Sequence, residues 1–93
     1  MNWSLEQNMR RFTKYVNKRL RDSIIIDTWG IYISGEDKYE VYIEIDYIDN
    51  FHSRDIYRIS PVSEFDILRL EFDHNMTKHL TEYRQQIYGR KDE

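Results

Sequence analysis

The clearest pattern along the chain is an alternation of apolar and polar residues between Lys38 and Ile48. A period of two, built from β-branched and aromatic residues, is typical of a β-strand that buries one face. The apolar positions between Ile24 and Ile33 can supply a matching face, so residues 24–48 predict a β-hairpin. The inner face of its second strand is predicted to contain Tyr39, Val41, Ile43, Ile45 and Tyr47.

The register of this hairpin follows from matching the two apolar faces. A three-residue turn at residues 35–37 achieves the match, whereas a slip of one residue would expose the whole apolar set. This register places Trp29 opposite Ile43 and makes both of them central core residues. It also places Asp27 opposite Ile45 on the inner face, which requires a frayed edge or a β-bulge there.

Residues 5–22 have the spacing of an amphipathic helix. Ser4 is suited to cap this helix, and Gln7, three residues later, completes a capping box. The helix is expected to end near Asp22 and Ser23. Its apolar stripe contains Leu5, Met9, Phe12, Val16 and Leu20. Its opposite, basic face contains Arg10, Arg11, Lys14, Lys18 and Arg21.

Residues 54–59 predict a third, weaker strand, and an apolar stripe from Phe65 to Ile87 predicts a second helix. Proline is well tolerated at the first helical position, so this helix is expected to begin at Ser60-Pro61. Two alternatives remain open, because residues 65–72 could form a fourth strand and His74-Asn75 could break the helix. Gly89 is a predicted stop, and residues 88–93 are expected to form a frayed tail.

The predicted order α-β-β-β-α, in a single domain of residues 1–93, indicates an α+β fold. A three-stranded antiparallel β-meander with both helices packed on one face is the simplest way to bury the three apolar surfaces. Ile67 and Leu70 point away from the apolar stripe of the second helix, so they are candidates for a homodimer contact.

Composition narrows the chemistry that we expect. The chain has no cysteine for disulfides or thiolate catalysis, and its three glycines cannot form a phosphate-binding loop. Glu71 and His74 have the spacing of carboxylate di-metal sites, but such sites need two of these motifs. We therefore expect no enzyme activity, no cofactor and no metal. Without an apolar run of about 18 residues or a secretory signal, we expect a cytoplasmic protein with no membrane contact.

The net charge of −3 conceals a separation of charge into blocks. Residues 5–22 contain six Lys or Arg against two acids, and residues 36–49 contain six acids against one Lys. Carboxylates two residues apart on a strand lie about 6.8 Å apart, which approaches the spacing of phosphates along a nucleic-acid strand. The acidic block, beside Tyr32, can therefore occupy a basic groove on another protein. The predicted partner-binding residues are Glu36, Asp37, Glu40, Tyr42, Glu44, Asp46 and Asp49.

The basic face of residues 5–22 supports an alternative function, nucleic-acid binding. The order α-β-β-β-α is similar to that of the double-stranded RNA-binding domain, and this resemblance implies the same possibility. That family carries a Lys-rich start to its last helix. At the matching place this chain reads Ser60-Pro61-Val62-Ser63-Glu64, followed by Asp66, which has the opposite charge.

The chain also resembles the small accessory proteins of phages and mobile elements, including anti-CRISPR inhibitors. It is short, cysteine-free and acidic, and it contains eight tyrosines. The preferred prediction is therefore a non-catalytic protein-binding module, an inhibitor that presents an acidic, tyrosine-bearing sheet face to a basic groove on a partner. A homodimer is compatible with this function, and direct nucleic-acid binding is the alternative.

Overall fold

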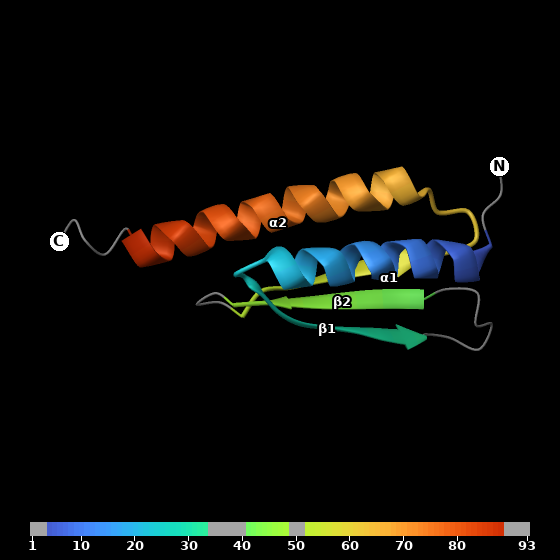
Figure 1. The fold of residues 1–93 in the computed structure, drawn as a ribbon, viewed down its shortest axis with the longest axis horizontal. Coiled ribbons are helices and arrows are strands. Elements are labelled where there is room, and N and C mark those ends of the chain that lie inside the picture. Colours follow the sequence, from blue (N-terminus) through green and yellow to red (C-terminus); the bar gives the residue numbers. More distant parts are fainter. Residues whose placement is uncertain (1–3, 34–40, 49–51, 89–93) are drawn as a thin grey trace.

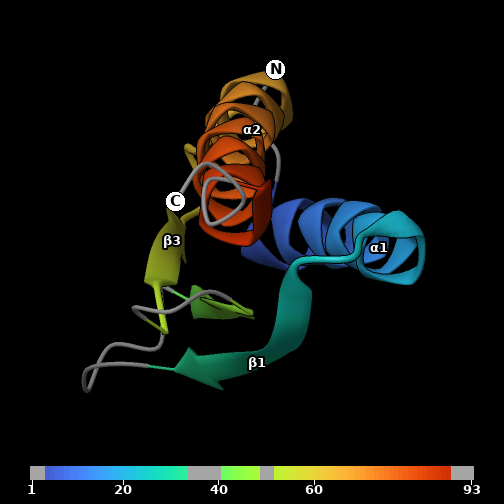
Figure 2. The same ribbon diagram turned by 90° about the vertical axis from the view of Figure 1, so that its left-hand side faces the viewer.

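The computed structural model describes residues 4–33, 41–48 and 52–88, and it shows a sheet layer and a helix layer (Figure 1). Three antiparallel strands form one sheet in the order β1-β2-β3, and both helices lie on the same side of it (Figure 2). The predicted α+β fold and its element order are confirmed. The elements are α1 (Leu5–Asp22), β1 (Ile26–Ile33), β2 (Val41–Tyr47), β3 (Arg54–Ile59) and α2 (Phe65–Tyr88).

Helix α1 begins and ends where its sequence predicts. The Ser4 hydroxyl accepts a hydrogen bond from the Gln7 amide at 3.1 Å, and the Gln7 side chain accepts one from the Ser4 amide at 3.2 Å. This capping box satisfies two amides that a helix start leaves unpaired. After Asp22 the chain becomes extended, and the Ser23 hydroxyl accepts hydrogen bonds from the amides of Ile25 and Ile26.

The predicted register of β1 against β2 is wrong by two residues. Trp29 pairs with Ile45 and not with Ile43. The inner and outer faces survive this error because side chains alternate with a period of two, and for the same reason the apolar pattern cannot distinguish registers that differ by two. The register shifts between Ile26 and Thr28, which bears out the expected bulge at Asp27. The predicted turn at residues 35–37 lies outside the described residues.

Helix α2 begins at Phe65, four residues later than Pro61 suggested. The intervening segment forms a turn instead, in which the Ser63 amide donates to the Ser60 carbonyl at 3.1 Å and the Ser63 hydroxyl accepts from the Ser60 amide at 2.9 Å. Asn8, buried on α1, donates from Nδ2 to the carbonyls of both serines at 2.9 Å. These four bonds hold residues 60–63 in a compact conformation that delays the helix.

From Phe65 the helix runs without a break to Tyr88. Residues 65–72 are therefore helical and not a fourth strand, and His74-Asn75 does not interrupt the helix. Tyr88, which was predicted to begin a frayed tail, is instead the last residue of the helix. The predicted stop at Gly89 and residues 90–93 lie outside the described residues. No helix in residues 4–33, 41–48 and 52–88 is both long and apolar enough to cross a membrane.

The core is centred on three aromatic rings from three elements. Phe12 on α1 lies 5.4 Å from Tyr57 on β3 and 5.9 Å from Phe72 on α2, measured between ring centroids, and Tyr57 and Phe72 lie 5.7 Å apart. All three side chains are buried, so their contacts combine a large buried area with favourable edge-to-face geometry. The helix layer is thereby fixed over β2 and β3.

The inner face of β1 is less well covered than its sequence predicts. Ile31 and Ile33 point to the helix side but remain 43% and 61% exposed, and Trp29 is only partly buried. These three residues are thus less completely covered than the inner residues of β2. The prediction that Trp29 is a central core residue is therefore wrong.

Substitution of Ile43 tests the assignment of this core. Ile43 is 0% exposed on the central strand, so we expect the Ile43→Ala variant to lose roughly 2–5 kcal/mol of unfolding free energy through lost transfer energy and a cavity. Urea unfolding followed by circular dichroism measures this loss. Ile56→Ala, on the opposite face and 51% exposed, is the control and should lose less than about 1 kcal/mol. Equal losses would contradict the assigned faces.

Candidate functional site

The outer face of the sheet carries no helix in the part of the chain that the structure describes (Figures 1 and 2). The strand register arranges nine residues on this face in three rows of three, one residue from each strand. We call these nine residues the outer face. Its rows are Tyr32–Tyr42–Arg58, Gly30–Glu44–Ile56 and Thr28–Asp46–Arg54.

A stacked pair of tyrosines forms one end of the outer face. The rings of Tyr32 and Tyr42 lie 5.4 Å apart at an interplanar angle of 10°. Cross-strand aromatic pairs of this kind stabilise a sheet modestly, and each ring also limits the freedom of the other. Tyr32 remains 41% exposed, so the pair presents a preformed aromatic surface of the type that is enriched at interfaces.

Two carboxylates of the predicted partner-binding set are described, those of Glu44 and Asp46, and both pair with Arg54. Its Nη1 lies 3.3 Å from Glu44 Oε1, and its Nε donates to Asp46 Oδ1 at 2.8 Å. The other Asp46 oxygen accepts a hydrogen bond from the Thr28 hydroxyl at 3.2 Å. With Arg58 beside Tyr42, the outer face contains as many arginines as acids.

The structure describes only part of the predicted partner-binding set. Tyr42, Glu44 and Asp46 lie together on the outer face, as their alternation predicts. The other four acids lie outside the described residues: Glu36, Asp37, Glu40 and Asp49. Ile56 was not among the predicted site residues, although it lies in the middle row and is half exposed. The sequence contained the signal for this position, because the alternation that turns Arg54 and Arg58 outward also turns Ile56 outward.

The basic face of α1 contains cations with three different environments. Arg10 pairs with Glu6 at 2.6 Å, and the Arg11 guanidinium lies 4.4 Å from the centroid of the Phe65 ring. The remaining three cations have no ion pair among the described residues; they are Lys14, Lys18 and Arg21. A groove of about 390 Å³ between α1 and α2 is lined by Arg11, Lys14, Tyr15, Lys18, Arg21 and Phe65. The structure thus brings together four of the five residues predicted for nucleic-acid binding.

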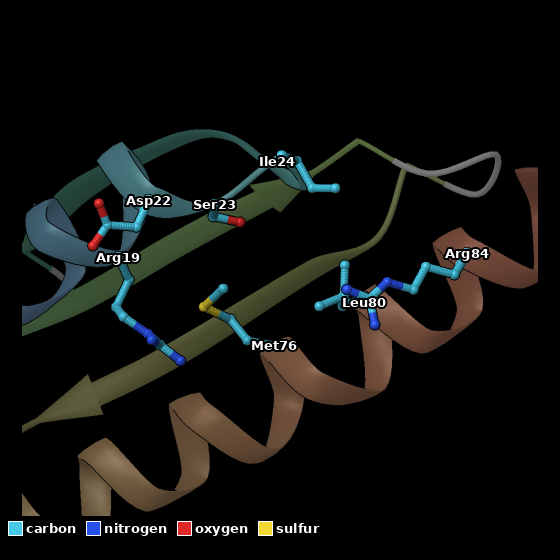
Figure 3. Close-up of a pocket in the computed structure, with 7 residues that line it drawn as sticks. All are labelled: Arg19, Asp22, Ser23, Ile24, Met76, Leu80 and Arg84. Carbon is cyan, nitrogen blue, oxygen red and sulfur yellow. The ribbon is translucent and has the colours of Figure 1, made fainter.

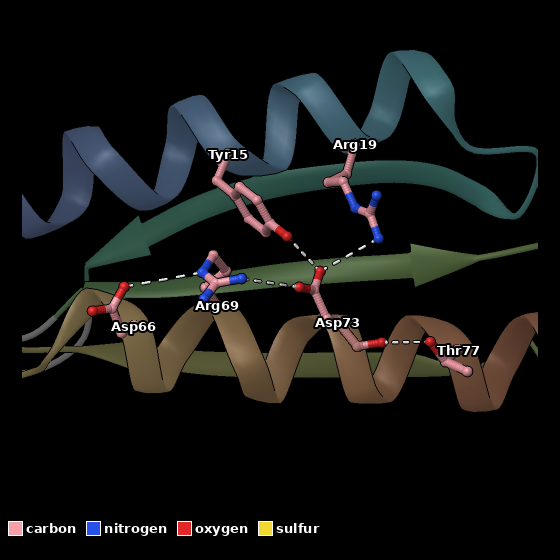
Figure 4. Close-up of polar contacts among 6 residues, drawn as sticks. All are labelled: Tyr15, Arg19, Asp66, Arg69, Asp73 and Thr77. Atoms are coloured by element: carbon pink, nitrogen blue, oxygen red, sulfur yellow. Dashed lines mark hydrogen bonds and ion pairs between the residues drawn. The ribbon is translucent and has the colours of Figure 1, made fainter.

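A polar cluster centred on Asp73 links helix α1 to helix α2 (Figure 4). Asp73 on α2 accepts a hydrogen bond from the Tyr15 hydroxyl at 2.5 Å and lies 3.4 Å from Arg19 Nη2. Its other oxygen lies 3.7 Å from Arg69 Nη1. Asp73 therefore offsets a cation from each helix, which removes Arg19 from the cations available to a ligand.

A hollow of about 300 Å³ lies where the end of α1 faces the middle of α2 (Figure 3). Ile24, Met76 and Leu80 supply apolar walls, and Arg19 and Arg84 lie at its rim. Among the described residues that line the hollow, only Ser23 has a hydroxyl, and it accepts hydrogen bonds from the amides of Ile25 and Ile26. These lining residues therefore include no nucleophile paired with a base.

His79 is buried in the core, which the sequence did not predict. Its Nε2 lies 3.0 Å from Asp55 Oδ2, and its ring packs 4.1 Å from that of Tyr47. The position of His79, three residues after Met76 on the apolar stripe, was the available signal. Within the described residues, no group of three His, Asp or Glu side chains is placed to hold a metal ion.

Three of the described tyrosines have a raised pKa. Burial raises the pKa of Tyr47 and of Tyr57 above the ordinary value of 10.0, and the charge of Asp55 adds to the effect at both. At Tyr15, burial raises the pKa first and the hydrogen bond to Asp73 raises it further. These phenols therefore strongly favour the neutral form in the folded protein.

Comparison of the chain with protein-family models, with curated proteins and with solved structures gives no match. The candidate sites consequently rest on geometry alone.

The raised pKa values predict a loss of stability at high pH. Tyrosines of the unfolded chain ionise near pH 10, whereas the buried ones stay neutral, so the unfolding free energy should fall as the pH rises past 10. Tyr47→Phe should reduce this slope by up to about 1.4 kcal/mol per pH unit. Urea unfolding from neutral to alkaline pH measures both slopes. A difference between variant and wild type that is constant with pH would show that packing alone is responsible.

Ile67 and Leu70 are each 59% exposed on α2, so both are available for the homodimer contact that the sequence predicts. We expect sedimentation equilibrium to give a mass above that of the 11.6 kDa monomer, because these side chains would lose contact with water in a dimer. Replacing both with Ser should shift the equilibrium to the monomer without lowering its stability. A monomer in the wild type at all micromolar concentrations would contradict the prediction.

Proposed function

We propose that the protein is a non-catalytic binding module of the cytoplasm, and that its outer face binds a partner protein with a basic groove. The observation that carries this proposal is the uncovered outer face, which combines a tyrosine pair, an exposed isoleucine, two acids and two arginines. Tyrosine and arginine are among the residue types that most often dominate binding energy at protein interfaces. Gly30 leaves open space in the middle row, since a Cβ there would meet nothing within 4 Å.

The pairing of Glu44 and Asp46 with Arg54 is compatible with a basic partner. Arg54 is more than half exposed, and exposed ion pairs of this kind contribute little to stability. A cation from the partner can therefore replace Arg54 at small cost and restore the same charge balance. The value of such acids lies in steering and in complementarity, which govern association rate and specificity.

The proposed partner is a protein whose groove normally holds nucleic acid. The sequence adds four further acids next to the ends of β2, at Glu36, Asp37, Glu40 and Asp49, which makes this part of the chain strongly acidic. Alternate carboxylates along β2 then imitate the charge spacing of a nucleic-acid strand. Occupation of the groove would exclude nucleic acid from the partner, so the module would act as an inhibitor.

Charge reversal on the outer face tests this function. Glu44→Lys combined with Asp46→Lys should abolish capture of the partner from a lysate of the native host, because like charges would then face each other. The captured protein should itself bind nucleic acid and should be released by duplex DNA or RNA. Lys14→Glu combined with Lys18→Glu changes the net charge by the same amount in the opposite direction, and it should leave capture intact. Circular dichroism verifies that both variants are folded.

The opposite result would favour the alternative function. If the lysine variant loses capture and the acid variant retains it, the basic face of α1 is the binding surface. Labelled duplex DNA or RNA should then bind the purified protein directly, with an affinity that falls linearly on a logarithmic salt scale. Capture that is unaffected by either variant would contradict both functions and would leave an apolar contact.

A further inference from the structure

The two edge strands of the sheet are buried to very different extents. On β3 the inner residues Tyr57 and Ile59 are fully covered by the helices, whereas on β1 the inner residues Ile31 and Ile33 are largely exposed. Within the described residues β1 pairs only with β2, so its other edge presents unpaired backbone amides and carbonyls. The fold therefore leaves at β1 both an open hydrogen-bonding edge and an apolar surface beside it.

A groove follows the side of α1 that faces β1. It has a volume of about 450 Å³, and Ile31 from β1 and Met9 from α1 supply its apolar surface. Arg10, Lys14 and Arg21 line the same groove. Neither Lys14 nor Arg21 has an ion pair among the described residues, so the groove is apolar at its base and positively charged at its rim.

We propose that β1 and this groove form a second binding site, which takes an extended acidic segment of another protein as a fourth strand. The backbone of the segment would pair with the free edge of β1, a recognised mode of peptide binding. Every second side chain would then point to the helix side of the sheet. Glutamates at those positions would lay their methylene groups along Ile31 and Met9 and direct their carboxylates to the cations of α1.

The repeat distances of the two elements agree. Alternate side chains of a strand are about 6.8 Å apart, and Arg10 and Lys14, four residues apart on α1, are separated by a rise of about 6 Å. Arg10 pairs with Glu6 at 2.6 Å, but both side chains are largely exposed, so an incoming carboxylate can replace Glu6 at small cost. Successive inward carboxylates can therefore reach successive cations of α1. Threonine or valine would suit the outward positions, because β-branched residues favour a strand.

The positive charge of the groove favours an acidic partner over a second copy of this chain. Pairing of β1 with β1 of another copy would place the two rims of Arg10, Lys14 and Arg21 close to each other, where like charges repel. The proposed site is separate from the outer face, since Ile31 and the groove lie on the helix side of the sheet. Its success or failure is therefore independent of the function proposed above.

A blocked peptide of alternating glutamate and threonine is the probe. We expect it to bind the purified protein and to slow hydrogen exchange at β1 amides, observed by nuclear magnetic resonance, without affecting those of β3. Lys14→Gln combined with Arg21→Gln should weaken binding on the order of tenfold. Lys78→Gln combined with Arg84→Gln removes the same charge from α2 and should leave the affinity unchanged.

Two further peptides separate strand addition from simple attraction between opposite charges. A lysine-threonine peptide has the same tendency to form a strand but the wrong charge, so it should not bind. A glutamate-threonine peptide with alternate backbone amides methylated keeps the charge but cannot donate to β1, so it should lose most of the affinity. Equal binding of the methylated peptide, equal weakening by the two protein variants, or no binding of the unmodified peptide would each overturn the proposal.

Discussion

The contact of Phe12 with Tyr57 and Phe72 determines how the other elements are placed. Phe12 is the only one of these rings on α1, so its burial fixes the position of that helix relative to β3 and α2. The inner residues Ile31 and Ile33 of β1 lie outside this contact and remain largely exposed. The fold therefore combines a fully buried aromatic centre with one incompletely covered strand.

Much of the fold could be predicted because the periodicity is strong. The capping box, the two faces of β2 and the bounds of β3 all follow from local sequence. The register of Trp29 could not be predicted, because a period of two leaves shifts of two residues equivalent. The start of α2 could not either, since Asn8 acts on residues 60–63 from more than fifty positions away.

The candidate sites show the same division between local and long-range information. The alternation of β2 sufficed to place Tyr42, Glu44 and Asp46 on one face. Which of the charges have partners depends on Arg54, on Asp73 and on the way the strands and helices meet. Charge counts along the chain treat Arg19 and Lys18 alike, whereas in the fold Asp73 offsets only the first of them.

The hydrogen bonds of Asn8 also bear on how the chain acquires its structure. The side-chain amide of Asn8 has its partners at Ser60 and Ser63, so these bonds of α1 can form only after two thirds of the chain have been synthesised. Contacts of such long sequence separation slow folding relative to a helical bundle of the same size. During synthesis the apolar side of α1 must therefore remain without its final partners, and the basic residues on its other face help to keep the nascent helix in solution.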